Sequence, residues 1–222
     1  MGILDRINSC DDLKKLSLDE LKNLAQELRE YIIKTVSENG GHLASNLGVV
    51  ELTLAMLSCI NPPKDKVVFD VSHQSYVYKI LTGRKEQFKT IRQTGGISGF
   101  QKISESPYDA FGSGHAGNAI SAAIGLATAR DAKGENDAVI AVVGDGAICN
   151  GISIEALTNA AQSTKRLIVV MNDNNMSISQ NVGSFSKGFG RLMVSPSYIR
   201  WRYYFDNRLS WLSNPYHWLT AR

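Results

Sequence analysis

The sequence lacks an apolar stretch long enough to span a membrane, and its first residues, Met1 to Asp12, lack the basic start and apolar segment of a secretory signal. Its three cysteines, Cys10, Cys59 and Cys149, are an odd number without the spacing of metal ligands. They therefore predict reduced thiols and give no indication of a disulfide framework. From these absences we expect a cytoplasmic protein without a membrane anchor.

The sequence also lacks a strong charge of one sign in its main part. Residues 191–222 contain five arginines and one acid, Asp206, so they contribute +4 to a total of +3 and leave −1 for the first 190 residues. A nucleic-acid binder needs clustered Lys and Arg to neutralise phosphates. We therefore expect no nucleic-acid partner.

No internal repeat or low-complexity tract divides the chain. With 222 residues and 43% apolar content, residues 1–190 can bury a sizeable core and are expected to form one domain. Residues 191–222 differ, because they hold all three tryptophans, eight of the eighteen aromatic residues and no lysine. This tail is interpreted as a truncation or frameshift product, or alternatively as a segment that docks a partner.

Apolar periodicity predicts alternating helices and strands. Ser17-Leu18-Asp19-Glu20 forms a capping-box pattern, and the helix that it starts should end at Gly40-Gly41. Further helices are expected at 46–60, 74–82, 118–133 and 151–163, and strands at 67–71, 138–143 and 167–171. This alternation predicts an α/β fold, a doubly wound and mostly parallel sheet with helices on both faces.

Two polar loops follow successive predicted strands. Gly144-Asp145-Gly146 comes after the strand at 138–143, and Asn172-Asp173-Asn174 ends the strand at 167–171. Ligands of open parallel sheets collect at the carboxyl ends of strands, so Asp145 and Asn174 are expected to share one site. Their hard oxygen donors suit Mg²⁺ that already carries phosphate oxygens, and the two glycines let backbone N–H groups approach a phosphate. Ordinary Asp-Gly and Asn-rich turns are the alternative, but the pairing favours the site.

Residues 94–117 form a long polar stretch that is expected to line a site, and it ends in Gly112-Ser113-Gly114-His115-Ala116-Gly117. Read literally, this is a dinucleotide-binding GxGxxG. That motif needs a clear strand before it and an acid about 20 residues later, on the next strand end. Only the short segment 108–111 precedes it, and the next strand-end acid, Asp145, lies 28 residues past Gly117. The nicotinamide interpretation is therefore disfavoured.

Three of the four histidines, His42, His73 and His115, stand beside Gly or Ser in predicted loops. A single loop histidine is as readily a surface or capping residue as a ligand contact. Three of them in such loops favour a binding site.

Four blocks of the chain carry a resemblance to a known family. They are residues 40–48 (GGHLASNLG), 70–76 (DVSHQSY), 79–84 (KILTGR) and 172–179 (NDNNMSIS). Together with Gly144-Asp145-Gly146 and Asn174, which look like the bipartite signature of thiamine-diphosphate enzymes, they resemble the 1-deoxy-D-xylulose-5-phosphate synthase family over roughly residues 37–183.

The resemblance implies a thiamine-diphosphate-binding fold and a set of site residues. Asp145, Asn174 and Met176 would hold Mg²⁺. His42 and His73 would be catalytic, with His42 facing the substrate and assisting proton transfers and His73 contacting the diphosphate region. The implied cofactor-binding residues are His73, Gly114, His115, Ala116, Gly144, Asp145, Gly146, Ala147, Asn174 and Met176.

The resemblance also implies a transferase that joins pyruvate and glyceraldehyde 3-phosphate to give 1-deoxy-D-xylulose 5-phosphate and CO₂, as a homodimer, with thiamine diphosphate and Mg²⁺ as cofactors. The chain stops before the family's pyrimidine-binding domain, so we expect no activity from it alone. Two alternatives remain open. The chain is the N-terminal subunit of a split transketolase-like enzyme whose partner chain supplies that domain, or it is a non-catalytic remnant of the fold.

Overall fold

The computed structural model describes residues 2–164 and 166–172. The chain divides into two compact units, Met1–Met176 and Ser177–Arg222, and all described residues belong to the first. Asn174, Met176 and the tail 191–222 lie outside the described residues, so the sequence predictions about them stay predictions. No described helix is both long and apolar enough to cross a membrane.

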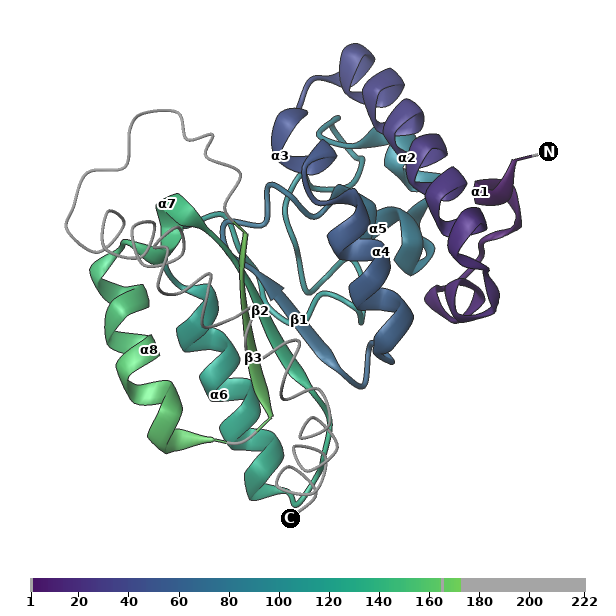
Figure 1. Cartoon of the computed structure of the whole chain (residues 1–222). Coiled ribbons are helices and arrows are strands. Elements are labelled where there is room, and N and C mark those ends of the chain that lie inside the picture. The colour runs from purple at the N-terminus through teal and green to yellow at the C-terminus, as the bar shows by residue number, and fades with distance from the viewer. Residues whose placement is uncertain (1, 165, 173–222) are drawn as a thin grey trace, which may run out of the picture. The chain divides into compact units, whose positions relative to one another are not determined.

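A three-stranded parallel sheet lies at the centre of this unit. Its strands are β1 (Lys66–Phe69), β2 (Val139–Gly144) and β3 (Leu167–Asn172), in the spatial order β1-β2-β3 (Figure 1). Both neighbouring pairs are parallel, with Phe69 opposite Val142 and Gly144 opposite Asn172. The three strands therefore end at the same edge of the sheet, as the sequence predicted.

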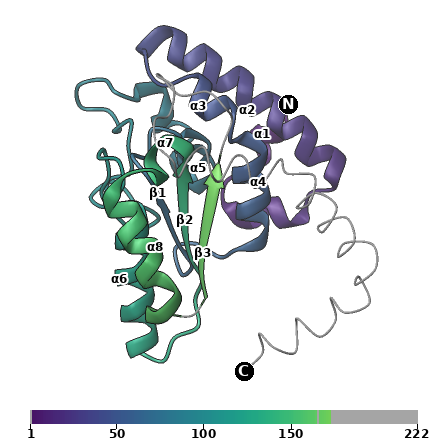
Figure 2. The same ribbon diagram turned by 60° about the vertical axis from the view of Figure 1, so that its left-hand side comes forward.

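Helices cover both faces of the sheet. Val68 and Ala141 point to one face and join a core with α6 (Ala119–Ala132) and α8 (Gly151–Ser163). Phe69 and Val142 point to the other face and join a core with α2 (Leu18–Asn39), α4 (Val50–Cys59) and α5 (Tyr76–Lys79). Figures 1 and 2 show α6 and α8 on one side of the strands and α2 and α4 on the other. This arrangement confirms the doubly wound α/β fold, because alternate strand residues must be buried on opposite faces.

The long helix α2 begins where the capping box predicts. The Ser17 side chain accepts a hydrogen bond from the Glu20 backbone N–H at 3.3 Å, and the Glu20 carboxylate accepts one from the Ser17 backbone N–H at 2.9 Å. The helix ends before Gly40, whose φ of 73° is unfavourable for residues with a side chain. Leu24, Leu28 and Ile32 form its fully buried stripe.

The predicted boundaries fail in three places. The helix expected at 46–60 is broken into α3 (Ala44–Leu47) and α4, with Gly48-Val49 between them. The helix expected at 74–82 begins two residues late, at Tyr76 of α5, and continues into a π-helical turn, Ile80–Arg84; its helical backbone is interrupted at Thr82 and Gly83, close to the predicted end. The strand expected at 67–71 stops at Phe69, because Val71 and Ser72 have φ values of 56° and 65° that turn the chain away from the sheet.

Short helices that the sequence did not predict complete the unit. They are α1 (Ile3–Arg6), 3₁₀ helices at Cys10–Lys15 and Gln87–Thr90, and α7 (Asp145–Ile148). The one-turn helix α7 lies at the carboxyl end of the sheet (Figure 2). It converts the Gly144-Asp145-Gly146 loop into a strand-to-helix turn.

Candidate functional site

The carboxyl edge of the sheet gathers the polar residues that follow each strand. Asp70 follows β1, Asp145 follows β2, and Asn172 is the last residue of β3. Because Gly144 is paired with Asn172, the chain leaves β2 and β3 at neighbouring positions. A Cβ atom built on Gly144 would meet no described atom within 4 Å, so the backbone at this turn borders open space.

The Asp70 carboxylate connects this edge to the glycine-rich loop. Asp70 is 1% exposed, and its two oxygens accept hydrogen bonds from the backbone N–H groups of Gly117 at 2.8 Å and Ala119 at 3.0 Å. The first turn of α6 carries unsatisfied N–H groups and a positive dipole end, so a carboxylate there is stabilised. Asp70 therefore fixes where the loop 112–117 ends.

The loop 112–117 lies next to the Gly144–Ala147 turn. The Ser153 hydroxyl contacts both segments, at 3.3 Å from the Gly117 carbonyl and 2.8 Å from the Ala147 carbonyl. Gly117 has a φ of 90°, and a Cβ there would lie 3.0 Å from Cβ of Asn150. The contact between the loop and the start of α8 is thus too close for a larger residue.

Within this loop, Gly114, His115 and Ala116 are exposed, and Gly114 has a φ of 132° with open space where a Cβ would stand. Exposed backbone that no side chain shields is the arrangement by which N–H groups approach a phosphate. Residues 108–111, which a dinucleotide-binding motif would need as a strand, do not form one. That finding removes the structural context of the nicotinamide interpretation.

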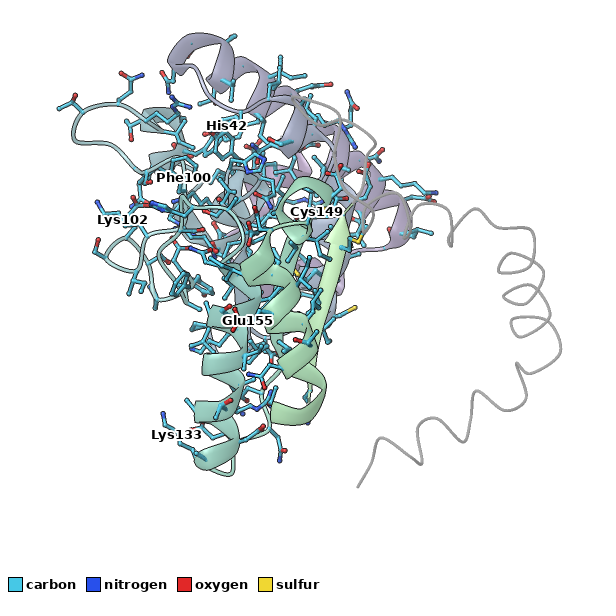
Figure 3. The ribbon with its side chains drawn as sticks, turned by 90° about the vertical axis from the view of Figure 1, so that its left-hand side faces the viewer. His42, Phe100, Lys102, Lys133, Cys149 and Glu155 are labelled. Carbon is cyan, nitrogen blue, oxygen red and sulfur yellow. The ribbon has the colours of Figure 1, made fainter. Side chains whose placement is uncertain are left out.

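His42 and His73 are brought together from segments on either side of β1. Their ring centroids are 5.3 Å apart at an interplanar angle of 68°, and the His42 ring is 5.9 Å from the ring of Phe100. Figure 3 shows His42 and Phe100 close to each other. The Nδ1 atoms of both histidines are buried and have no hydrogen-bond partner among the residues that the structure describes. Buried polar atoms without partners are rare, and two together suit a polar ligand.

The environment keeps both imidazoles neutral near pH 7. Burial lowers the pKa of His42 below its usual 6.5, and the charge of Arg92 lowers it further. Burial also lowers the pKa of His73, and His42 adds to that effect, while Asp70 opposes it. Neutral imidazoles offer one nitrogen as a donor and the other as an acceptor, as proton transfer requires.

The predicted magnesium ligands are only partly within the described residues. Asp145 begins α7 and is half-buried, whereas Asn174 and Met176 lie outside the described part of the chain. Across residues 2–164 and 166–172, no three His, Cys, Asp or Glu side chains gather as a metal cluster. The predicted Mg²⁺ site differs from such a cluster, because it has only one carboxylate and one amide side chain. Phosphate oxygens and water would complete the coordination of the metal ion.

A depression elsewhere on the unit does not belong to this region. It is lined by Lys64, Lys66, Lys133, Glu135, Asn136 and Asp137. Lys66 is the first residue of β1, so the depression lies at the amino ends of the strands. Ligands of parallel sheets bind at the other end, where Asp70 and Asp145 lie.

Some residues of this region were missed by sequence reasoning. Asp70 ends a buried strand as Asp145 does, so the same signal was available for it. Ser153 and Phe100 gave no local signal, because one is a small polar residue in a helix and the other an ordinary aromatic in a loop.

Comparisons with known proteins agree on one family. The family model described as 1-deoxy-D-xylulose-5-phosphate synthase matches residues 4–220. A relative of that name from Carboxydothermus hydrogenoformans is 59% identical over 198 residues, which are 89% of this chain and 32% of the relative. One from Syntrophomonas wolfei is 57% identical over 198 residues, covering 89% and 31%. The chain thus spans about a third of the length of these relatives.

Proposed function

This chain belongs to the 1-deoxy-D-xylulose-5-phosphate synthase family, and from that premise we propose that it binds thiamine diphosphate and Mg²⁺ at the carboxyl edge of its sheet. The observation that carries the proposal is the meeting of three segments at that edge. Asp145 follows β2, the loop 112–117 is held beside it by Asp70 and Ser153, and β3 ends next to β2.

Each of these segments has a role in the proposal. Asp145, Asn174 and Met176 hold the metal ion, with Asp145 and Asn174 giving side-chain oxygens and Met176 its backbone carbonyl. The residues proposed to approach the diphosphate through backbone or short side chains are Gly114, His115, Ala116, Gly144, Gly146 and Ala147. The open space at Gly114 and Gly144 supports this, because no described side chain blocks the backbone there.

The two histidines act on the reacting side. His73 contacts the diphosphate region, and His42 faces the substrate and accepts or returns a proton at a ring nitrogen. Their lowered pKa values support this role, because a neutral imidazole is needed to take up a proton. Thiamine diphosphate, when bound, supplies the carbanion chemistry that joins a decarboxylated 2-oxo acid to an aldehyde.

The whole reaction is proposed for a larger assembly than this chain. The substrates are pyruvate and glyceraldehyde 3-phosphate, and the chain acts as a homodimer or together with a complementing chain that brings a pyrimidine-binding domain. The second candidate, a split transketolase-like enzyme, differs only in the source of that domain.

Titration calorimetry tests the binding proposal. Thiamine diphosphate is titrated into the chain with and without Mg²⁺, alone and with a pyrimidine-binding domain of a family member. We expect heat that depends on Mg²⁺, and at least about a tenfold loss of affinity, or about 1.4 kcal/mol, for Asp145→Ala and for Asn174→Ala. Asp19→Ala, an exposed acid on α2, is the matched control and should bind as the wild type does.

Two results would count against the proposal. Unchanged affinity in Asp145→Ala would remove the metal assignment. Absence of binding by the wild type, even with the added domain, would favour a non-catalytic remnant of the fold.

A further inference from the structure

A single buried amide, that of Asn46, joins the two segments that carry His42 and His73. Asn46 lies in α3 and has no exposed surface. Its Nδ2 donates to the His42 carbonyl at 2.6 Å and to the His73 carbonyl at 2.7 Å. Its Oδ1 accepts from the Tyr76 backbone N–H at 2.9 Å. Three hydrogen bonds thus connect one side chain to two segments about thirty residues apart.

The chemistry of the amide is specific to this arrangement. An Asn side chain offers two N–H donors on one nitrogen and a carbonyl acceptor. At this position the side chain must donate to two backbone carbonyls, those of His42 and His73, and accept from one backbone N–H, that of Tyr76. Aspartate would place an acceptor against two carbonyls, and serine would satisfy only one of them.

The hydrogen bonds of Asn46 end at the backbone of the very residues whose rings meet. The His42 and His73 centroids are 5.3 Å apart, and neither ring nitrogen Nδ1 has a partner among the described residues that would hold it in place. The His42 backbone N–H also donates to the Tyr76 hydroxyl at 3.3 Å, and a Cβ on Gly41 would lie 2.7 Å from that hydroxyl. Hydrogen bonds to the backbone therefore hold together the two segments that carry the pair.

We propose that Asn46 is a positioning residue that sets the distance and orientation of the His42–His73 pair by holding both backbone carbonyls. The hydrogen bonds described for Asn46 go to backbone atoms and to neither ring, so it acts through the backbone of the two histidines. Its importance for turnover rests on the proposed function, but the positioning itself can be measured in the chain without any cofactor.

Nuclear magnetic resonance on the 222-residue chain with labelled histidines measures the pair directly. The wild type is expected to show cross-relaxation between the His42 and His73 ring protons. Both rings should titrate below the usual histidine range, mainly because they are buried; the charge of Arg92 adds to this effect for His42 and that of His42 adds to it for His73, whereas Asp70 opposes it. In Asn46→Ala and Asn46→Asp, we expect loss of the ring-to-ring signal and an upward shift of both titrations, because the freed loops expose the rings to water.

A control separates positioning from general loss of stability. Leu28→Ala removes a fully buried side chain from α2 and should destabilise the fold while leaving the hydrogen bonds of Asn46 to His42 and His73 in place. We expect it to keep the ring-to-ring signal and both titrations. Amide dispersion reports whether each variant is folded. If Asn46→Ala is unfolded, Asn46→Ser, which retains one donor, is measured in its place and should weaken the signal.

Folded Asn46 variants with an unchanged ring-to-ring signal and unchanged titrations would overturn the proposal. So would an equal change in Leu28→Ala. Calorimetry with thiamine diphosphate is a separate measurement on the same samples. If the wild type fails to bind while the Asn46 variants still lose the pair, the proposed function fails and the positioning role stands.

Discussion

Replacing Asp109 by Ala is expected to be the most destabilising single charge removal among the ion pairs described here. The Asp109 carboxylate has no exposed surface and receives two bonds from the Arg84 guanidinium, at 2.6 and 3.0 Å. It also accepts the Lys102 backbone N–H at 3.0 Å and lies 3.8 Å from the ammonium of Lys79. Glu105 completes the cluster, 2.8 Å from Lys79.

The size of the effect follows from burial. Removing one partner of a buried ion pair leaves the other charge uncompensated and costs about 3–5 kcal/mol. Arg84 would retain the Thr82 hydroxyl at 3.0 Å and a distant Glu105 at 3.9 Å, so we expect about 3 kcal/mol, the lower end. Burial lowers the pKa of Lys79, whereas its bond to Glu105 and the charge of Asp109 act in the opposite direction.

Urea-induced unfolding followed by circular dichroism is the assay. The midpoint should fall with an unchanged slope, because the same surface is exposed on unfolding. Lys22→Ala serves as the control, since it breaks a pair of similar length, 3.0 Å, whose side chains are 66% and 87% exposed. We expect that variant to unfold close to the wild type, as exposed pairs contribute little. Equal losses in the two variants would refute the burial argument.

Two further predictions concern the candidate site. Acidification should destabilise the fold. As the pH falls through 6.5, His42 and His73 bind protons in the unfolded chain but not yet in the folded chain, because their folded pKa values are lowered. The free energy of unfolding therefore decreases until the pH falls below these folded pKa values. Urea midpoints measured between about pH 8 and 5 should decrease with falling pH, and the decrease should be smaller in a His42→Gln/His73→Gln double variant. An equal decrease in the variant and the wild type would count against the lowered pKa values of the two histidines. Asp70→Asn should cost about 1–3 kcal/mol, because one of the N–H groups of Gly117 and Ala119 loses its acceptor. Urea unfolding and proteolysis of the loop 112–117 measure this, and a variant as stable and as resistant as the wild type would contradict it.

The candidate site was predictable in part. Asp145 and His73 were predicted as site residues because a polar residue directly after a buried strand, or a histidine beside Ser in a predicted loop, is a local signal. The resemblance implied a role for His42 and for His73 but not that their rings meet, and no spacing rule gives a 5.3 Å approach of rings 31 positions apart in the chain. The pairing of Asp145 with Asn174 stays a prediction, since Asn174 lies outside the described residues.

Sequence by itself determined the alternation of helices and strands and the start of α2, because apolar period and capping chemistry act between residues a few positions apart. It did not predict the break at Gly48-Val49, which follows Asn46, the residue whose side chain binds two distant carbonyls. Nor did it predict that Asp70 would cap the start of α6, 47 and 49 residues away. Only the tertiary structure decides which polar side chains become buried, because their partners come from segments that no local pattern relates.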